Sequence, residues 1–405
     1  MSTTSELTAS RWAGIDAGKE HHWVCVIDDT GQTVWSSKVL NDETAILDAI
    51  STVLGSGGEV TWGIDITGTA SGLLLALLAA HGQRVFYVPG RTVNRMAGAY
   101  RGEAKTDARD AYVIAETIRH RQDLSLVDVP ATVVAELRLL VGHRTDLVAD
   151  RVRMLNRLRD VLTGYFPGLE RAFDLSNHKG ALILLTGYQT PDALRRLGRT
   201  RLAGWLTKRK VRAAGDVAAT AIAAAEGQHT AIPGEKTAGS IVAELAQALL
   251  DLDERIGKID RQVTEAFRGH PQAEIIESMP GIGPILGAEL IVAAGDIGSY
   301  ADAGRLASAA GLVPVPRDSG RRTGNMHRPR RYSRKLRRVF YLSAQSAIIR
   351  PGPNRDYYLK KRAAGCKHVQ ALLALARRRV DVLWALLRDN RTFTIDSPTK
   401  TAIAA

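Results

Sequence analysis

Between residues 10 and 125 the chain alternates short apolar runs with longer amphipathic ones. Three short runs come first, at Trp12–Asp16, His22–Ile27 and Thr33–Val39, and Asp28-Asp29-Thr30-Gly31 lies between the last two. A short apolar run bounded by turn residues is typical of a buried strand, and this four-residue segment has the composition of a hairpin turn. The pattern therefore predicts three antiparallel strands at the start of the chain.

Helical and strand patterns alternate after these three runs. The predicted helices and strands are Asp42–Leu54 (helix), Val60–Ile66 (strand), Gly72–His81 (helix), Arg84–Val88 (strand) and Thr106–Arg121 (helix). Three antiparallel strands, then alternating helix and strand, then a closing helix is the order of elements in the ribonuclease-H-like fold. We predict an α/β domain of this RuvC-like kind over residues 10–125.

Residues 126–270 have a helical pattern almost throughout. From Val242 to Val263 the apolar positions alternate spacings of three and four, which is the period of a coiled-coil seam. A matching seam runs from Val134 to Leu162, and Arg144 and Arg151 interrupt it. The two helices can pair with each other or with a second subunit, and the sequence leaves both arrangements open.

A third part, residues 271–392, is also predicted to be helical, and residues 393–405 form a flexible tail. The segment Met279-Pro280-Gly281-Ile282-Gly283-Pro284 leads into an apolar helix, and its Pro-Gly-x-Gly turn resembles a helix-hairpin-helix element. The backbone amides of Gly281 and Gly283 in such a turn can contact a DNA phosphate without sequence preference. The sequence thus predicts an α/β domain followed by all-helical parts.

Composition narrows the classes of protein that fit this pattern. A chain of 405 residues is long enough for two or three domains, and a net charge of +13 favours a polyanionic partner. The two cysteines, Cys25 and Cys366, exclude a disulfide framework and a cysteine-rich zinc site. We see no signal peptide in the polar segment Met1–Ser10 and no apolar run long enough to span a membrane, so we expect a cytoplasmic protein.

The basic charge is concentrated in one segment of the third part. Residues 317–338 hold ten lysines and arginines and a single acid, Asp318, with Tyr332 between them. A run of one sign with an interleaved aromatic residue favours nucleic-acid contact over an ordinary solvated face. The predicted contact residues of this segment are Arg317, Arg321, Arg322, Arg328, Arg330, Arg331, Arg334 and Lys335.

Four aspartates carry the candidate chemistry. Asp16 and Asp65 lie where an apolar strand ends against glycine, and Asp107 and Asp110 have the i, i+3 spacing that places both on one helix face. Each has an ordinary explanation by itself, as a turn cap or as a first-turn acid favoured by the helix dipole. Clustered carboxylates, however, need a cation, and hard oxygen ligands suit Mg²⁺ or Mn²⁺. Together in a basic protein they predict metal-dependent chemistry on phosphodiesters.

The chain resembles the DEDD transposases of bacterial insertion sequences, a family described as bridge-RNA-guided recombinases and related to the pilin-gene invertases. The motifs that carry the resemblance occur in the family's order between residues 14 and 388: Gly14-Ile15-Asp16, Asp65-Ile66-Thr67-Gly68, Lys105-Thr106-Asp107-Ala108-Arg109-Asp110-Ala111, Met279-Pro280-Gly281-Ile282-Gly283-Pro284, Gly311-Leu312-Val313-Pro314 and Asp318-Ser319-Gly320. One position departs from the family pattern, because Asp65 stands where glutamate is common.

The resemblance implies a mechanism and a set of partners. The four aspartates would bind one or two Mg²⁺ ions at the scissile phosphate, and Ser319 would attack DNA to form a transient phosphoserine link. An RNA encoded by the mobile element would select donor and target DNA by base pairing. The subunits would assemble as a dimer or a tetramer, in which Ser319 of one subunit meets the acids of another.

Three other functions fit part of the pattern. A RuvC-like structure-selective nuclease needs the acids but no serine. An actin-like ATPase or sugar kinase also opens with a Gly-Ile-Asp-x-Gly strand, but the sequence has no second glycine-rich phosphate loop or adenosine motif further on. A nucleic-acid-binding scaffold would leave the four-acid set without a role.

Overall fold

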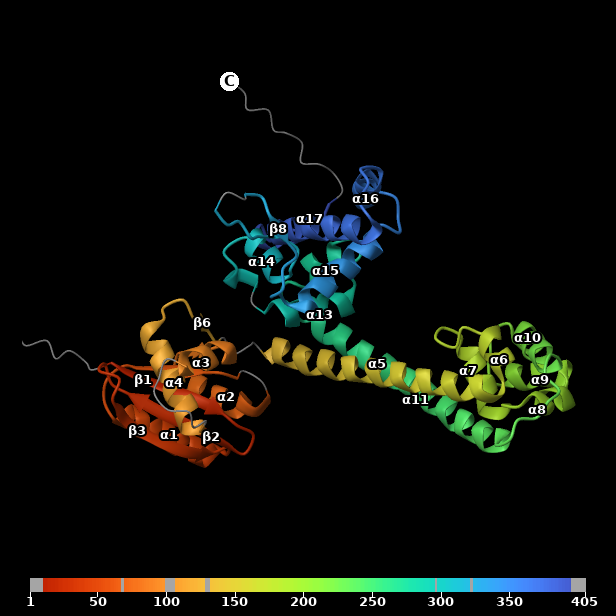
Figure 1. Cartoon of the computed structure of the whole chain (residues 1–405), viewed down its shortest axis with the longest axis horizontal. Helices are drawn as coiled ribbons and strands as arrows, with labels where there is room; N and C mark the ends of the chain where they lie inside the picture. Colours follow the sequence, from red (N-terminus) through yellow and green to blue (C-terminus); the bar gives the residue numbers. More distant parts are fainter. Residues whose placement is uncertain are drawn as a thin grey trace, which may run out of the picture. The chain divides into compact units, whose positions relative to one another are not determined.

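A computed structural model gives the fold of the chain (Figure 1). It describes residues 10–66, 69–98, 106–127, 132–295, 297–320 and 323–394. The chain divides into two compact units, residues 1–130 and 131–405, and each is considered by itself. The predicted boundary at residue 270 lies inside the second unit, and residues 395–405 of the predicted tail lie outside the described residues.

The first unit is a mixed α/β domain. Its elements are β1 (Arg11–Ala17), β2 (His21–Ile27), β3 (Thr33–Leu40), α1 (Glu43–Gly55), β4 (Val60–Ile64), α2 (Gly72–Ala80), β5 (Val85–Tyr87), α3 (Gly90–Ala97), α4 (Asp107–His120) and β6 (Ser125–Leu126). Six strands of the described residues form one sheet in the order β3-β2-β1-β4-β5-β6. β1, β2 and β3 are antiparallel, β4 and β5 are parallel to β1, and β6 is antiparallel to β5.

This arrangement confirms the predicted α/β class and the three antiparallel strands at the start of the chain. The short elements α3 and β6 were not predicted. β6 has only two residues, and α3 has only eight, half of them polar, so neither contains an apolar run that stands out in the sequence. β4 ends at Ile64, two residues before the predicted end of that strand. The shorter strand leaves Asp65 just beyond the sheet.

Two glycines let α4 pack directly on the sheet. A Cβ atom on Gly14 would lie 2.1 Å from the carbonyl oxygen of Ala111, and a Cβ atom on Gly63 would lie 2.7 Å from Cγ2 of Ile118. Gly14 faces helix backbone, which cannot move aside as a flexible side chain can. The face of the sheet that carries Gly14 and Gly63 is therefore the face that α4 covers.

We predict that Gly14→Ala destabilises the first unit by about 1–3 kcal/mol or more, because the added methyl group forces α4 off the sheet. Chemical denaturation monitored by circular dichroism measures the loss. Gly55→Ala is the matched control, since its methyl group meets nothing within 4 Å at the end of α1. Equal stability of the Gly14→Ala variant and the parent protein would contradict the close packing of α4 on β1.

The direction of α4 follows from the contacts of its last turn. Arg119 donates a hydrogen bond from Nη1 to the carbonyl oxygen of Asp29 (2.9 Å), in the turn between β2 and β3. That turn follows Ile27, which pairs with Trp12 at the start of β1. The last turn of α4 therefore lies beside the start of β1. Consequently α4 runs antiparallel to β1 and begins beside the carboxyl ends of β1 and its parallel neighbour β4.

The second unit is mostly helical. Its elements are α5 (Thr132–Tyr165), α6 (Pro167–Ala172), α7 (Lys179–Gly187), α8 (Pro191–Leu197), α9 (Arg199–Lys208), α10 (Ala214–Glu226), α11 (Glu235–Arg268), α12 (Ala273–Ser278), α13 (Pro284–Ala294), α14 (Ala303–Ala309), β7 (Val315–Pro316), β8 (Met326–His327), α15 (Arg334–Ala347), α16 (Pro353–Ala363) and α17 (His368–Arg388). Its helical character agrees with the prediction for the remainder of the chain.

The long helices α5 and α11 pair with each other in antiparallel fashion. Arg144 forms an ion pair with Asp260, and Arg151, one heptad further along α5, forms an ion pair with Asp253, one heptad back along α11. The two arginines that interrupt the seam in the sequence thus form ion pairs across it, one heptad apart on each helix. Of the two arrangements left open by the sequence, this structure contains the intramolecular one.

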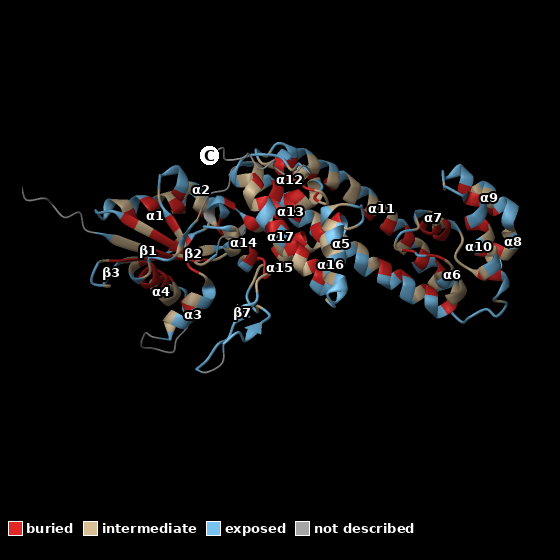
Figure 2. Cartoon of the chain, turned by 90° about the horizontal axis from the view of Figure 1, so that it is seen from above, coloured by how far each residue is buried: buried red, intermediate tan, exposed pale blue. Residues whose placement is uncertain are grey.

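Two hydrophobic cores lie at opposite ends of this helix pair. One contains Leu137 and Phe267 and is completed by α12–α17, and the other contains Leu162 and Val242 and is completed by α6–α10. Figure 2 shows buried residues concentrated in both regions, with a more exposed stretch of α5 and α11 between them. We call α6–α10, residues 167–226, the helical cap.

Candidate active site and nucleic-acid interface

Asp16 and Asp65 lie side by side at the edge of the sheet. β1 and β4 are parallel with Ile15 opposite Ile64, so Asp16 and Asp65 occupy the next pair of positions along the two chains. The backbone N–H of Ala17 donates a long hydrogen bond to Oδ1 of Asp65 (3.5 Å). Because side chains alternate along a strand, Asp16 lies on the same face as Gly14, which is the face covered by α4. β1 and the end of β4 thus present two carboxylates on the α4 side.

The other two aspartates are at the start of α4. Thr106 caps this helix, since its Oγ1 accepts a hydrogen bond from the backbone N–H of Arg109 (3.3 Å), and Asp107 and Asp110 occupy the first turn. The side chain of Arg109 donates from Nη2 to the carbonyl oxygen of Ala97 (3.1 Å), which joins α3 to α4. Because α4 begins beside the carboxyl ends of β1 and β4, all four aspartates lie at one edge of the sheet.

The electrostatics of Asp65 reflect this proximity. Burial raises the pKa of Asp65, and the negative charge of Asp110 raises it further, while the backbone N–H of Ala17 opposes both effects. In the described part of the chain, no three histidine, cysteine, aspartate or glutamate side chains are close enough to form a metal site as they stand. The four-acid metal site therefore stays a prediction. The structure adds that the aspartates lie at the same end of the sheet and that the charges of Asp65 and Asp110 repel each other.

We predict that Asp65→Asn stabilises the protein at pH 7 in the presence of EDTA. An acid whose pKa is raised on folding favours the folded state below its unfolded pKa, and this contribution is lost as pH rises through the folded pKa. At neutral pH the buried charge therefore destabilises the native state, and a neutral amide removes that penalty together with the repulsion from Asp110. Thermal unfolding of both proteins should show a higher midpoint for Asp65→Asn at pH 7 and a smaller difference as pH falls towards 4. A lower midpoint at pH 7 would contradict this.

Ser319 lies in an exposed loop of the second unit, between β7 and β8. The backbone N–H of Arg317 donates to the carbonyl oxygen of Asn325 (2.8 Å), and Oδ1 of Asp318 accepts from the backbone N–H of Asn325 (2.9 Å). Gly320 has a φ of +54°, a conformation that glycine adopts at no steric cost. The hydrogen bond between Asp318 and Asn325 thus joins the two sides of the loop, and Ser319 lies next to it with an exposed side chain.

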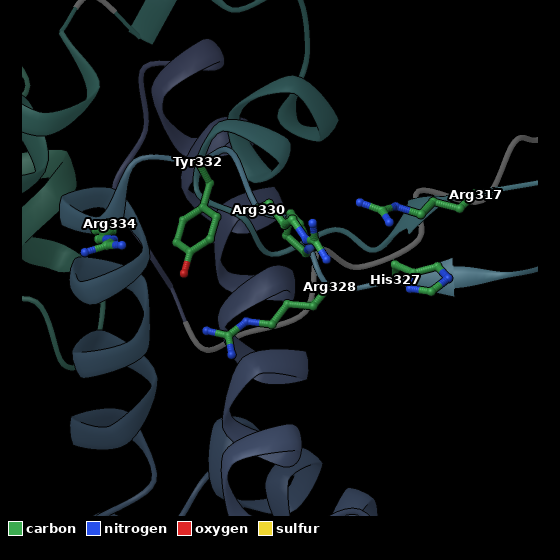
Figure 3. Close-up of a pocket in the computed structure, with 7 residues that line it drawn as sticks. Arg317, His327, Arg328, Arg330, Tyr332 and Arg334 are labelled. Carbon is green, nitrogen blue, oxygen red and sulfur yellow. The ribbon is translucent and has the colours of Figure 1, made fainter.

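A basic hollow lies beside this loop (Figure 3). It measures about 430 Å³, and its lining residues are Arg317, His327, Arg328, Pro329, Arg330, Tyr332 and Arg334. A hydrogen bond with Arg328 and the positive charges of Arg337, Arg328 and Arg334 lower the pKa of the Tyr332 hydroxyl. In Figure 3 this hydroxyl points towards the guanidinium group of Arg328. With no carboxylate in its lining, the hollow suits a phosphate group.

The structure places the predicted basic residues as follows. This hollow is lined by Arg317, Arg328, Arg330 and Arg334, and a neighbouring hollow of about 380 Å³ is lined by Arg331. Lys335 is exposed on α15. Arg321 and Arg322 lie outside the described residues. His327 and Tyr332 also line the hollow. The sequence singled out Tyr332 as the interleaved aromatic residue but did not assign it a contact, and it gave no signal for His327.

The turn between α12 and α13 contains the two predicted glycines. Gly281 has a φ of +85°, and a Cβ atom there would lie 2.6 Å from the carbonyl oxygen of Ser343 in α15. Internal packing therefore requires glycine at this position. Gly283 is exposed with open space around its Cα, so its backbone remains accessible. Contact between this turn and DNA stays a prediction.

Arg379 on α17 holds the same turn in place. Its side chain is 2% exposed and donates from Nη2 to the carbonyl oxygen of Pro280 (2.6 Å). Its Nε donates to Oγ of Ser343 (2.8 Å) and its Nη1 to Oδ1 of Asn354 (3.2 Å). Burial lowers its pKa to about 10. The sequence offers no signal for this role, because Arg379 is one of three consecutive arginines and only the fold buries it.

Comparison with known proteins supports the reading of these motifs. Residues 13–167 match the family model described as "Transposase", and residues 273–359 match that of the "Transposase IS116/IS110/IS902 family". The chain is 62% identical over 392 residues to the 44.8 kDa protein of insertion element IS116 from Streptomyces clavuligerus, covering 96% of this chain and 98% of that protein. It is 52% identical over 397 residues to the 42 kDa protein of insertion element IS900 from Mycobacterium paratuberculosis, covering 97% of this chain and 99% of that protein.

The chain belongs to the IS110/IS116 family of insertion-sequence transposases. A more distant relative is the pilin gene-inverting protein of Moraxella bovis, 27% identical over 147 residues that cover 34% of this chain and 45% of that protein. The recognised family is thus confirmed, and DNA is the substrate of the transposase. Among the described residues, no helix is long and apolar enough to cross a membrane.

Proposed function

We propose that this transposase cuts and exchanges DNA strands with two sets of groups, the four aspartates of the first unit and Ser319 of the second. The observation that carries the proposal is that Asp16 and Asp65 follow one another's register at the carboxyl ends of β1 and β4, while Asp107 and Asp110 lie in the first turn of α4, which begins beside those ends. A ribonuclease-H-like, RuvC-like fold for the first unit is part of the proposal, and the mixed sheet with the order β3-β2-β1-β4-β5 and α4 over β1 supports it.

The aspartates would hold one or two Mg²⁺ ions, with Mn²⁺ as a substitute. Carboxylate oxygens are the ligands that these cations prefer, and the raised pKa of Asp65 indicates a charge that a cation would stabilise. When bound, Mg²⁺ offsets the charge that develops on the scissile phosphate and its leaving oxygen. The chain itself orients the carboxylates, through the N–H of Ala17 for Asp65 and the Thr106 cap for α4.

Ser319 would be the nucleophile. Its Oγ forms a bond to phosphorus while one bridging P–O bond of the DNA backbone breaks. The serine proton passes to solvent, and the deoxyribose oxygen takes up a proton from solvent and leaves as a hydroxyl. A new strand end reverses these bond changes, so rejoining needs no external energy source. Because a serine hydroxyl is a weak nucleophile, the positive charge of Arg317 and of the basic hollow would stabilise the phosphate under attack.

The same basic surface would bind nucleic acid. The hollow and the accessible turn at Gly283 suit the backbones of donor DNA, target DNA and a guide RNA encoded by the mobile element. Selection of sites by that RNA, and assembly of the transposase as a dimer or tetramer, complete the proposal. The helix-hairpin-helix-like character of the α12–α13 turn belongs to it as well.

The test is incubation of the full chain with the element's DNA ends, target DNA and RNA, with and without Mg²⁺. We expect recombined DNA and a covalent protein–DNA adduct only when Mg²⁺ and the RNA are both present. Cleavage without any adduct would favour a RuvC-like structure-selective nuclease that uses the acids alone. Recombination in EDTA would exclude the metal site.

A further inference from the structure

The helical cap carries a dense positive charge that the chemistry above does not use. Between residues 179 and 212 the chain has nine lysines and arginines and a single acid, Asp192. This segment lies between the two matched family segments, residues 13–167 and 273–359, so neither assigns it a role. The whole helical cap has ten lysines and arginines and five acids, so its excess positive charge is concentrated in this segment. Such a local excess calls for a polyanion or for internal partners.

Some of these cations have internal structural partners. Arg195 donates from Nη1 to the carbonyl oxygens of Ala225 and Gln228 at the end of α10, and Arg196 pairs with Asp192. Arg201 donates to the carbonyl oxygen of Leu197 (2.8 Å) at the end of α8. Arg195 and Arg201 thus bind carbonyl groups at helix ends, and Arg196 forms an ion pair, so all three have a structural role.

The remaining charge is concentrated where α9 ends. Lys208, Arg209, Lys210 and Arg212 are all exposed, and within the described residues none of them has an ion pair. We call residues 208–212 the basic loop. The guanidinium carbon of Arg209 lies 3.6 Å from the ring centroid of Trp205, and Tyr188 contacts the same ring edge-on at 5.2 Å. This stack holds a cation at the surface in a defined position.

The backbone of the basic loop has an unfavourable residue at its tightest point. The N–H of Val211 donates to the carbonyl oxygen of Leu206 (3.1 Å) and the N–H of Lys210 to that of Thr207 (2.9 Å), which together form a Schellman motif. The left-handed position of this motif usually holds glycine, but here it holds Lys210 with a φ of +57°. Ala213, three residues on, is also left-handed, with a φ of +52°. The loop thus retains a lysine at a position where glycine would be more stable.

We propose that the basic loop binds the phosphate backbone of duplex DNA, as a contact separate from the four aspartates and Ser319. Four cations on a short, tightly hydrogen-bonded loop complement a polyanion, and strain is kept where function requires it. Lysines act as point charges without base selectivity, so the contact would be independent of sequence. The inference takes from the family only that DNA is the substrate.

Lys210 allows a test that separates binding from folding. Lys210→Gly should raise the unfolding midpoint by about 1–3 °C, because it relieves the left-handed strain. The same change should weaken binding of the full chain to a blunt duplex of arbitrary sequence, by roughly eightfold at about 0.1 M salt and with a log–log salt slope flatter by about 1. Lys210→Arg keeps the charge and should keep both affinity and slope. Higher stability with unchanged binding would overturn the proposal.

A triple variant extends the test. Lys208→Ala, Lys210→Gly and Arg212→Ala together should flatten the salt slope by about 3. The matched control is a triple variant that neutralises Arg153, Arg196 and Lys258. It also removes three positive charges, but in the parent protein these charges are paired with Asp150, Asp192 and Glu254. Equal slopes for the two triple variants would overturn the proposal, as would a loss confined to a hairpin RNA probe with duplex binding intact. Since Asp16 and Ser319 are untouched, residual cleavage at saturating DNA separates this outcome from failure of the catalytic proposal.

Discussion

Asp16→Asn and Asp110→Asn are each expected to reduce DNA strand cleavage by about 10³-fold or more, the scale on which single electrostatic groups act at a transition state. Asp16 comes from β1 and Asp110 from the first turn of α4, so each variant removes one carboxylate from the shared edge. Asparagine keeps the size of the side chain and removes its charge, which a divalent cation needs. Asp107→Asn and Asp65→Asn should behave in the same way. Single-turnover cleavage of labelled element ends in Mg²⁺ measures the effect.

Binding separates this role from a structural one. Because the aspartates are negatively charged and DNA is a polyanion, neutralising one of them should leave duplex affinity unchanged or slightly higher. Asp48→Asn, an exposed acid on α1 of the same unit, is the matched control and should retain cleavage. If all four variants lose nucleic-acid binding as well as cleavage, the aspartates hold the fold together. If Asp16→Asn retains recombination, a nucleic-acid-binding scaffold becomes the better description of the first unit.

Ser319→Ala is expected to abolish the covalent protein–DNA adduct and strand exchange, with no change in stability. The side chain is exposed in the loop between β7 and β8, so loss of its hydroxyl removes no packing. Without the nucleophile, the bond to phosphorus cannot form, and the residual rate is that of water attack. Denaturing electrophoresis of protein bound to labelled DNA detects the adduct directly.

Two comparisons sharpen this experiment. Ser308→Ala removes an exposed hydroxyl from α14 in the same unit and should leave the adduct intact. In the Ser319→Ala protein, Mg²⁺-dependent nicking without an adduct would identify the acids as a nuclease centre that does not need the serine. Strand exchange that survives in Ser319→Ala would show that the covalent mechanism is wrong.

The position of α4 illustrates how much of the site was predictable. Thr106 as a cap and the i, i+3 spacing of Asp107 and Asp110 predicted a helix with two acids in its first turn, and that helix begins at Asp107. Which end of the sheet those acids reach is shown by contacts such as that between Arg119 and Asp29, which are 90 residues apart. No local pattern encodes such a pairing, because it arises from packing two finished elements against each other.

For the basic residues, the sequence indicated where positive charge is concentrated but not what each cation does. A count of charge singled out residues 317–338, and four of the predicted arginines line one hollow. The same kind of count assigned no function to Arg379 or to the basic loop, since a solvated arginine, a buried one and one at a strained turn look alike in sequence. Burial distinguishes Arg379, and the loop is distinguished by its exposed cations, the stack of Arg209 on Trp205 and the backbone angle of Lys210.

By itself, the sequence determined the family, the α/β class of the first unit, the helical remainder and the identities of the candidate catalytic groups. These follow from the hydrophobic periodicity, the helix-capping residues and the short sequence motifs, which are all properties of residues close together in the chain. The tertiary structure decided that α5 pairs with α11 within the chain, that the four aspartates share one edge of the sheet, and that Gly281 is packed against α15. Those outcomes depend on which surfaces bury each other, and residues far apart in the chain contribute to each of them.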